Sequence, residues 1–198
     1  MEHALELGRP RMTLTFPGTA RAGSPAPVKA DLAATIRAVA SGDEAAFASL
    51  YADHVRMVHA ILLGRVPARD VDDIVQEVFL AAYRRIRELR DAAAFGGWLA
   101  AIARNRATDY LRQVREVMEL PPEMPGGDPI ESETLAVLDI IRKLPDAYRE
   151  TLLMRLVEGM TGDEIAARTG LTPGSVRVNL HRGMKMLREQ LGMEPGTP

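Results

Sequence analysis

The stretch that decides the fold is Thr161-Gly-Asp-Glu-Ile-Ala-Ala-Arg-Thr-Gly-Leu-Thr-Pro-Gly-Ser-Val-Arg-Val-Asn-Leu-His-Arg-Gly-Met-Lys185. Thr161 and Glu164 have the spacing of a capping box, in which each side chain satisfies a free backbone amide of the other residue. Gly170 can adopt the left-handed conformation that ends a helix. Thr172 and Pro173 then supply a cap and a first helical residue. The stretch therefore predicts two short helices joined by a glycine turn, the arrangement of a helix-turn-helix.

The second helix of this stretch has two chemically different faces. Apolar residues recur on one face at the spacing of a buried stripe: Val176, Leu180, Met184, Leu187 and Leu191. The other face carries hydroxyl groups, cations and one small apolar side chain, and no acidic residue occurs between Thr172 and Arg188. Such a face suits the phosphates and base edges of a DNA major groove, and a solvated basic face on an ordinary terminal helix is the alternative. The helix-turn-helix register favours DNA contacts by Ser175, Arg177, Val178, His181, Arg182 and Lys185.

Composition limits the fold class. The chain has 198 residues, of which 46% are hydrophobic but only 5% aromatic, and helix-forming residues are abundant. We therefore expect an all-α protein, and two small helical modules fit this length better than one large core. The absence of cysteine excludes disulfides and thiolate metal sites. No apolar run approaches the roughly 20 residues that span a bilayer, and the first residues do not resemble a signal peptide.

Proline and glycine divide the chain into parts. Residues 1–30 contain several of both without helical periodicity, which predicts a flexible extension. A second interruption at residues 116–131 contains six prolines and glycines and predicts a semi-extended linker. The remaining sequence forms an N-terminal module over residues 31–115, a C-terminal module over residues 132–192 and a short tail over residues 193–198.

The N-terminal module opens with a predicted helix that starts at a capping box of Ser41 and Glu44 and ends at Gly64. His54 lies within the apolar stripe of this helix. No second histidine or carboxylate occurs at metal-ligand spacing on the same face. We therefore interpret His54 as a packed structural residue and predict no metal site.

The next helix begins at Asp70 and carries acidic and amide side chains outward. Val71, Ile74, Val75, Val78, Phe79 and Ala82 form its predicted buried stripe. The acids of the first turn are explained by the helix dipole alone. Gln76 and Glu77 lie beyond that turn, and the residues alone leave a solvated face and a partner surface equally open.

A third helix follows Phe95 and has a basic outer face. Arg104, Arg106, Arg112 and Arg115 outnumber Asp109 there, which makes this face a second candidate surface for nucleic-acid phosphates. Trp98 falls on the apolar stripe, so we interpret it as a core residue rather than a base-stacking platform.

Several phrases of the sequence together resemble one family. They are Asp73-Ile-Val-Gln-Glu-Val-Phe79, Phe95-Gly-Gly-Trp-Leu-Ala-Ala-Ile-Ala-Arg-Asn-Arg-Ala-Thr-Asp-Tyr-Leu-Arg112, Leu144-Pro-Asp-Ala-Tyr-Arg-Glu150, Val157-Glu-Gly-Met-Thr-Gly-Asp-Glu-Ile-Ala166 and Gly174-Ser-Val-Arg177. In this order, over about residues 40–191, they resemble regions 2.2, 2.3, 2.4 and 4 of bacterial extracytoplasmic-function (ECF) sigma factors. The resemblance implies a transcription initiation factor that binds core RNA polymerase, performs no covalent chemistry and needs no cofactor.

The resemblance also implies a role for each surface. The β′ clamp helices of the polymerase would contact Asp73, Gln76 and Glu77, and the β subunit would also bind the factor. The −10 promoter element would lie on Arg104, Asn105, Arg106, Asp109 and Arg112. The −35 element would lie on the six helix-turn-helix residues given above. Residues 89–94 match the loop that captures a base flipped out of the non-template strand. An anti-sigma factor is a further implied partner of this cytoplasmic protein, and such a factor can hold it at the membrane.

Two positions depart from the family pattern. Val178-Asn179 replaces the usual continuation of the recognition helix, so the −35 sequence cannot be copied from relatives. Gly183-Met184 replaces a usual Arg-Ala pair, which removes a cation that we expect on the DNA side. The main alternative is a helix-turn-helix transcriptional regulator that does not bind core polymerase. A helical enzyme is a further alternative, but no nucleophile, metal cluster or phosphate-binding glycine loop supports it.

Overall fold

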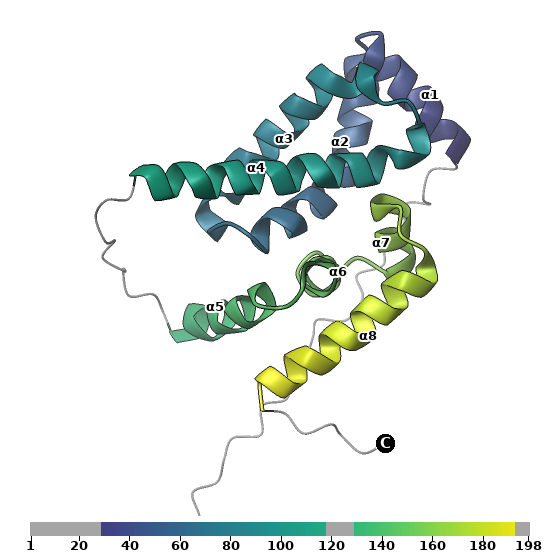
Figure 1. Ribbon diagram of the computed structural model, residues 1–198. Helices are drawn as coiled ribbons and strands as arrows, with labels where there is room; N and C mark the ends of the chain where they lie inside the picture. Colours follow the sequence, from purple (N-terminus) through teal and green to yellow (C-terminus); the bar gives the residue numbers. More distant parts are fainter. Residues whose placement is uncertain (1–28, 118–128, 193–198) are drawn as a thin grey trace, which may run out of the picture.

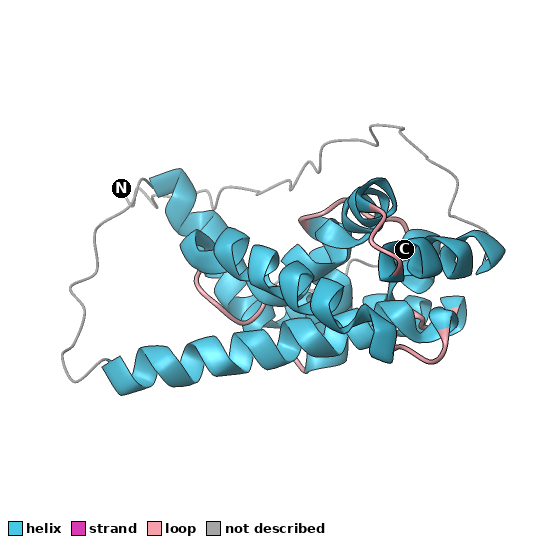
Figure 2. Ribbon diagram, turned by 90° about the horizontal axis from the view of Figure 1, so that it is seen from above, coloured by secondary structure: helices cyan, strands magenta, loops and turns pink. Residues whose placement is uncertain are grey.

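The computed structural model describes residues 29–117 and 129–192, and all regular structure within these ranges is helical (Figures 1 and 2). Residues 1–28 of the predicted extension, residues 118–128 of the predicted linker and the tail lie outside the described residues. Residues 29–30, 116–117 and 129–131, which the sequence assigns to the extension and the linker, are instead helical. The long helices are α1 (Lys29–Ala40), α2 (Glu44–Leu63), α3 (Val71–Arg85), α4 (Phe95–Val117), α5 (Pro129–Arg142), α6 (Asp146–Leu156), α7 (Gly162–Thr169) and α8 (Pro173–Gln190). Short 3-10 turns occupy Ala68–Asp70, Ile86–Glu88 and Ala92–Ala94.

The N-terminal module is a bundle in which α2 packs against α1, α3 and α4. Val58, Ile61, Val71 and Leu99 are fully buried at its centre. Each such side chain contributes about 1.5–3 kcal/mol through removal of apolar surface from water. All six residues of the predicted α3 stripe are buried, which confirms that prediction.

The start of α2 differs from the prediction. Asp43, not Ser41, caps the helix, and its carboxylate accepts a hydrogen bond from the amide of Ala46 at 3.0 Å. The Ser41 hydroxyl instead donates to the carbonyl of Ala38 at 2.8 Å, so it closes α1. Gly42 lies between the two helices with a φ of 95°. The predicted capping box was wrong because this turn shifts the start of α2 by two residues.

The C-terminal module is built around α6, which is covered from two directions. The run from Glu150 to Met154 is buried throughout, so α6 has no solvent-facing stripe along this part. One side of α6 packs on α8 and another packs on α2 of the first module. Figure 1 shows α6 between α4 and α8. A helix buried on several sides is the middle layer of a larger assembly, and here it joins the two modules.

The predicted helix-turn-helix is confirmed in detail. The Thr161 hydroxyl accepts from the Glu164 amide at 3.2 Å, and the Glu164 carboxylate accepts from the Thr161 amide at 2.7 Å. This backbone hydrogen bond lowers the pKa of Glu164. Gly170 ends α7 with a φ of 76°, and Thr172 caps α8 by accepting from the Ser175 amide at 3.1 Å. The two helix caps and the glycine turn between them therefore determine where α8 begins.

Gly183 lies on the buried side of α8, so the expectation that this position belongs to the DNA side was wrong. It shares that side with Val176 and Leu187. A Cβ atom at Gly183 would lie 3.0 Å from side-chain carbons of Leu152 and 3.2 Å from Tyr148 Cβ. The glycine thus allows α8 to approach α6 closely. Because residue 183 does not lie on the outer face, a glycine there does not remove a cation from that face.

The two glycines that flank α7 provide a matched test of this motif. Gly170→Ala should destabilise the protein by about 1 kcal/mol, because a Cβ is disfavoured at positive φ. Gly162→Ala should be neutral or stabilising, because its Cβ would make ordinary contact with Val176 at 3.9 Å and alanine favours a helix. Urea unfolding followed by circular dichroism measures both. Equal effects of the two substitutions would contradict the assigned turn.

Candidate nucleic-acid and partner interfaces

The outward face of α8 is exposed along its length. The exposed residues include all six that the sequence assigns to DNA: Ser175, Arg177, Val178, His181, Arg182 and Lys185. Val178 is 45% exposed and places one apolar group among the polar side chains of this face. Lys185 on this face forms a long ion pair with Glu189, at 3.8 Å. These cations are therefore available to a ligand.

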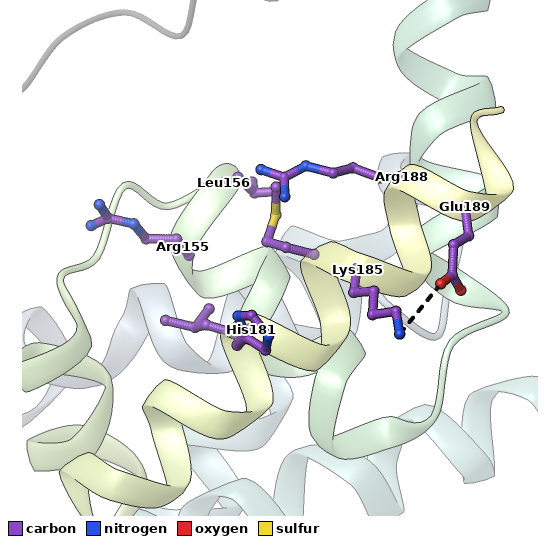
Figure 3. A pocket seen from close by; sticks show the side chains of 8 residues that line it. Arg155, Leu156, His181, Lys185, Arg188 and Glu189 are labelled. Atoms are coloured by element: carbon purple, nitrogen blue, oxygen red, sulfur yellow. Dashed lines mark ion pairs between the residues drawn. The ribbon is translucent and has the colours of Figure 1, made fainter. Parts of the chain in front are cut away.

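A groove of about 580 Å³ runs between α6 and α8, next to this face (Figure 3). Leu156, Leu180 and Met184 supply its apolar lining. Arg155, His181, Lys185, Arg188 and Glu189 also line it, so four of its five polar side chains are basic or histidine. Leu180 and Met184 were predicted to be buried, but α6 covers them only in part. His181 and Lys185 thus border both the DNA face and the groove.

The outer face of α3 combines acidic and apolar groups. Asp73, Gln76 and Glu77 are exposed, as predicted. Gln76 also lines a groove of about 390 Å³ together with Glu44, Phe47, Tyr51, Phe79, Leu80 and Tyr83. Leu80 is 49% exposed. Sequence reasoning missed Leu80 and Tyr83, although both fall outside the buried stripe of α3, which was the available signal. An apolar patch beside acids fits a protein partner.

The residues on the basic face of α4 differ in their exposure and in their ion-pair partners. Asn105 and Arg112 are exposed, and Arg106 and Asp109 are half-buried. Arg112 pairs with Asp109 at 3.1 Å. Arg104 instead forms two hydrogen bonds with the Glu150 carboxylate of α6, at 2.8 and 2.7 Å. These bonds raise the pKa of Arg104. Arg104 therefore differs from the other predicted DNA residues of this helix in having its partner on α6, although 42% of its side chain is exposed.

The aromatic residues in the first turn of α4 and the loop before that helix have structural contacts. Trp98 is half-buried, and its ring lies 5.9 Å from that of Phe95. In the loop of residues 89–94, the Asp91 carboxylate accepts from the Ala93 amide at 2.9 Å and caps a short 3-10 turn. Trp98 thus packs on the core, as interpreted from the sequence.

His54 is a structural residue. It is 2% exposed, its Nδ1 donates to the Leu50 carbonyl at 3.0 Å, and its ring lies edge-on to Phe95 at 4.9 Å. Burial lowers its pKa to about 4, so the ring is neutral at physiological pH. No group of three or more metal-binding side chains occurs within the part of the chain that the structure describes.

Comparisons with known proteins match both modules. A family model for Sigma-70 region 2 matches residues 50–116, and a model for Sigma-70, region 4 matches residues 134–187. RNA polymerase sigma factor CarQ of Myxococcus xanthus is 32% identical over 76% of this chain and 92% of its own length. The ECF RNA polymerase sigma-E factor of Escherichia coli is 30% identical over 77% of this chain and 90% of its own length.

The chain belongs to the ECF RNA polymerase sigma factors. It is an alternative sigma factor that directs RNA polymerase to promoters. A solved structure of CnrH in complex with the cytosolic domain of CnrY covers 82% of the chain and 97% of CnrH, with 27% identity and a TM-score of 0.55. Among the described residues of the sigma factor, no helix is long and apolar enough to cross a membrane.

The free energy of unfolding of the sigma factor depends on pH through two histidines, whose effects have opposite signs. The pKa of His54 is depressed to about 4, so its contribution to stability is present above pH 6.5 and is lost as the pH falls towards 4. The full contribution is roughly 3 kcal/mol. The free energy of unfolding should therefore fall less between pH 7 and pH 4.5 in His54→Leu than in the unmodified protein.

His59→Gln is the control for this measurement. The hydrogen bond from His59 to Glu158 raises the pKa of His59, so its contribution is present at low pH and is lost as the pH rises. Replacing His59 with glutamine should therefore make the protein lose more stability on acidification. Urea unfolding at several pH values measures both variants. The same pH dependence in His54→Leu and the unmodified protein would contradict the assignment of a neutral buried imidazole.

Proposed function

We propose that the sigma factor binds promoter DNA and core polymerase through three separate surfaces. The outer face of α8 reads the −35 element through Ser175, Arg177, Val178, His181, Arg182 and Lys185. The basic face of α4 binds the −10 element through Arg104, Asn105, Arg106, Asp109 and Arg112. The outer face of α3 docks on core polymerase through Asp73, Gln76 and Glu77. The observation that carries the proposal is the exposure of the acid-free face of α8, which has groups for both phosphates and base edges.

The polymerase contact extends beyond the three predicted residues. Leu80 and Tyr83 lie beside Gln76 and provide an apolar area that the acids border. Buried apolar anchors with a charged rim are typical of the energetically important part of an interface. We assign this combined surface to the β′ clamp helices. The groove between α6 and α8 has an apolar lining with several cations, and we assign it to the β subunit.

The remaining assignments concern organisation and regulation. A region 2 domain over residues 31–115 and a region 4 domain over residues 132–192 act in the cytoplasm. The protein performs no covalent chemistry, because nucleotidyl transfer belongs to the polymerase. CnrH was solved with the cytosolic domain of CnrY, and we propose that a dedicated anti-sigma factor likewise binds this protein.

The polymerase surface is tested by the double substitution Gln76→Ala with Glu77→Ala. Both side chains are exposed, so the fold should be unaffected. Affinity for purified core RNA polymerase should fall by about tenfold, the effect of losing one strong interface anchor. Asp72→Asn, an exposed change in the first turn of the same helix, is the control. Binding should be measured by biolayer interferometry and promoter-dependent transcription by run-off assay.

Two results would refute this assignment. If the unmodified, correctly folded protein fails to bind core polymerase with no inhibitor present, the function in polymerase recruitment is wrong for this chain. If the double variant binds as tightly as Asp72→Asn, the docking surface lies elsewhere.

The −35 assignment is tested by selecting DNA sequences from a random pool with the holoenzyme. Arg177→Ala should weaken binding to the selected duplex by about tenfold and relax the preference at one position, as expected for loss of a base contact worth 1–3 kcal/mol. Lys143→Ala removes the same charge from an exposed position between α5 and α6. Equal losses in the two variants would show a purely electrostatic effect and contradict base reading at Arg177.

A further inference from the structure

Val178 is the one apolar side chain among the six residues of α8 that we assign to the −35 element. We propose that Val178 recognises the C5-methyl group of a pyrimidine base, so that one position of the −35 element is selected by its methyl group. Thymine carries this group, and so does a cytosine that has been methylated at C5. Val178 can do so only if α8 binds the −35 element, as proposed above.

Val178 lies in the N-terminal half of α8, which is the part of a recognition helix that contacts base edges. Ser175 precedes it by three residues, and His181 and Arg182 follow it by three and four residues. Side chains at these spacings are neighbours on a helix, and all four are exposed. Polar contacts from Ser175 and Arg182 to base edges therefore place Val178 against the same edges.

The position of the Val178 methyl groups is fixed by the helix. A valine in a helix occupies one side-chain rotamer almost exclusively. The helix itself is anchored near this residue, because Thr172 caps it through the Ser175 amide and Val176 is buried, with 1% exposure. Gly183 lets the helix pack closely on α6. Val178 thus cannot turn away from a base that its neighbours bind.

The chemistry of valine selects one group in the major groove. Its side chain has no hydrogen-bond donor or acceptor. Contact with the amino group of adenine or cytosine, or with the carbonyl of guanine, would therefore remove that group from water without replacing its hydrogen bonds. The C5-methyl of thymine is the apolar group that a base edge presents there. Val178 should therefore favour thymine over the other three bases and favour 5-methylcytosine over cytosine.

The surroundings of Val178 do not fit a contact with a protein. The apolar groove between α6 and α8 is lined by Leu156, Leu180 and Met184, and Val178 is not among its lining residues (Figure 3). Its neighbours on the outer face are instead exposed hydroxyl and basic groups. A single apolar side chain among such groups lacks the contiguous apolar area that marks a protein interface.

Uracil substitution isolates the methyl group in the DNA, because uracil differs from thymine only in lacking it. Each thymine of the −35 element that the holoenzyme selects is replaced by uracil in turn, and holoenzyme affinity is measured by competition binding. The unmodified protein should lose about fourfold in affinity at one position, as expected when one methylene-sized group is no longer buried. Equal affinity at every position, or a selected element without thymine in either strand, would overturn the inference.

Val178→Ser tests whether Val178 detects that methyl group. Serine and valine have similar helix propensities and position 178 is exposed, so the fold should be retained, as circular dichroism will show. In this variant the uracil and thymine duplexes should bind equally. Val157→Ser makes the same substitution at a valine that is 51% exposed at the end of α6, and it should keep the difference between the duplexes. A difference that persists in Val178→Ser would assign the methyl contact to another residue and overturn the inference.

5-Methylcytosine supplies the converse test, in which a methyl group is added. The thymine identified by uracil substitution is replaced by cytosine or by 5-methylcytosine, each paired with guanine. The unmodified protein should bind the 5-methylcytosine duplex about fourfold more tightly than the cytosine duplex, and Val178→Ser should not distinguish them. Equal affinity of the unmodified protein for these two duplexes would overturn the inference. Both comparisons on the unmodified protein change only the DNA, so they remain decisive if Val178→Ser fails to fold.

Failure of methyl recognition can be distinguished from failure of the −35 assignment. If the holoenzyme selects no preferred sequence near −35, or if Arg177→Ala and Lys143→Ala lose affinity equally, both are wrong. If the holoenzyme selects a preferred sequence and Arg177→Ala relaxes it, but uracil has no effect at any position, the assignment of α8 stands. Recognition of a methyl group by Val178 is then wrong.

Discussion

The Glu150 carboxylate is enclosed on α6, with α8 packed on one side of that helix and α2 on another. Removing a carboxylate from water costs several kcal/mol, and the cost is offset here by Arg65 and Arg104, both from the first module. The charge on Glu150 can therefore be buried only when both modules are present. Loss of one partner from such a buried pair costs about 3–5 kcal/mol. This requirement adds to the apolar contacts between the modules, since one cluster of buried apolar residues runs through both.

Ion pairs of this kind specify how the two modules pack against each other but add little to the stability of that packing. Buried ion pairs add little net stability compared with apolar packing, and water or a competing phosphate can replace each partner. The cluster is also imperfect, since the Nε atoms of Arg65 and Arg149 are buried without a hydrogen-bond partner. Each unpaired donor costs about 1–3 kcal/mol.

The features that the sequence predicted correctly depend on neighbours a few residues apart. The capping box of Thr161 and Glu164, the turn at Gly170 and the buried stripe of α3 follow from local hydrogen bonding and helical periodicity. One error was local, because Asp43 rather than Ser41 caps α2. Another arose where a second element decides the outcome. Gly183 faces Leu152 of α6 rather than DNA. The ion pair of Arg104 with Glu150 could not be predicted either, because the two residues lie 46 positions apart and no helical pattern on α4 distinguishes Arg104 from Arg106.

The division of promoter reading between α4 and α8 is the central claim, and site-specific photocrosslinking within the holoenzyme tests it most directly. A benzophenone amino acid is placed at Asn105 in one variant and at Val178 in another, both exposed positions. On one promoter with a mapped start site, position 105 should crosslink near −10 and position 178 near −35. Crosslinking of both positions to the same element, or of neither to promoter DNA in an active holoenzyme, would contradict the account.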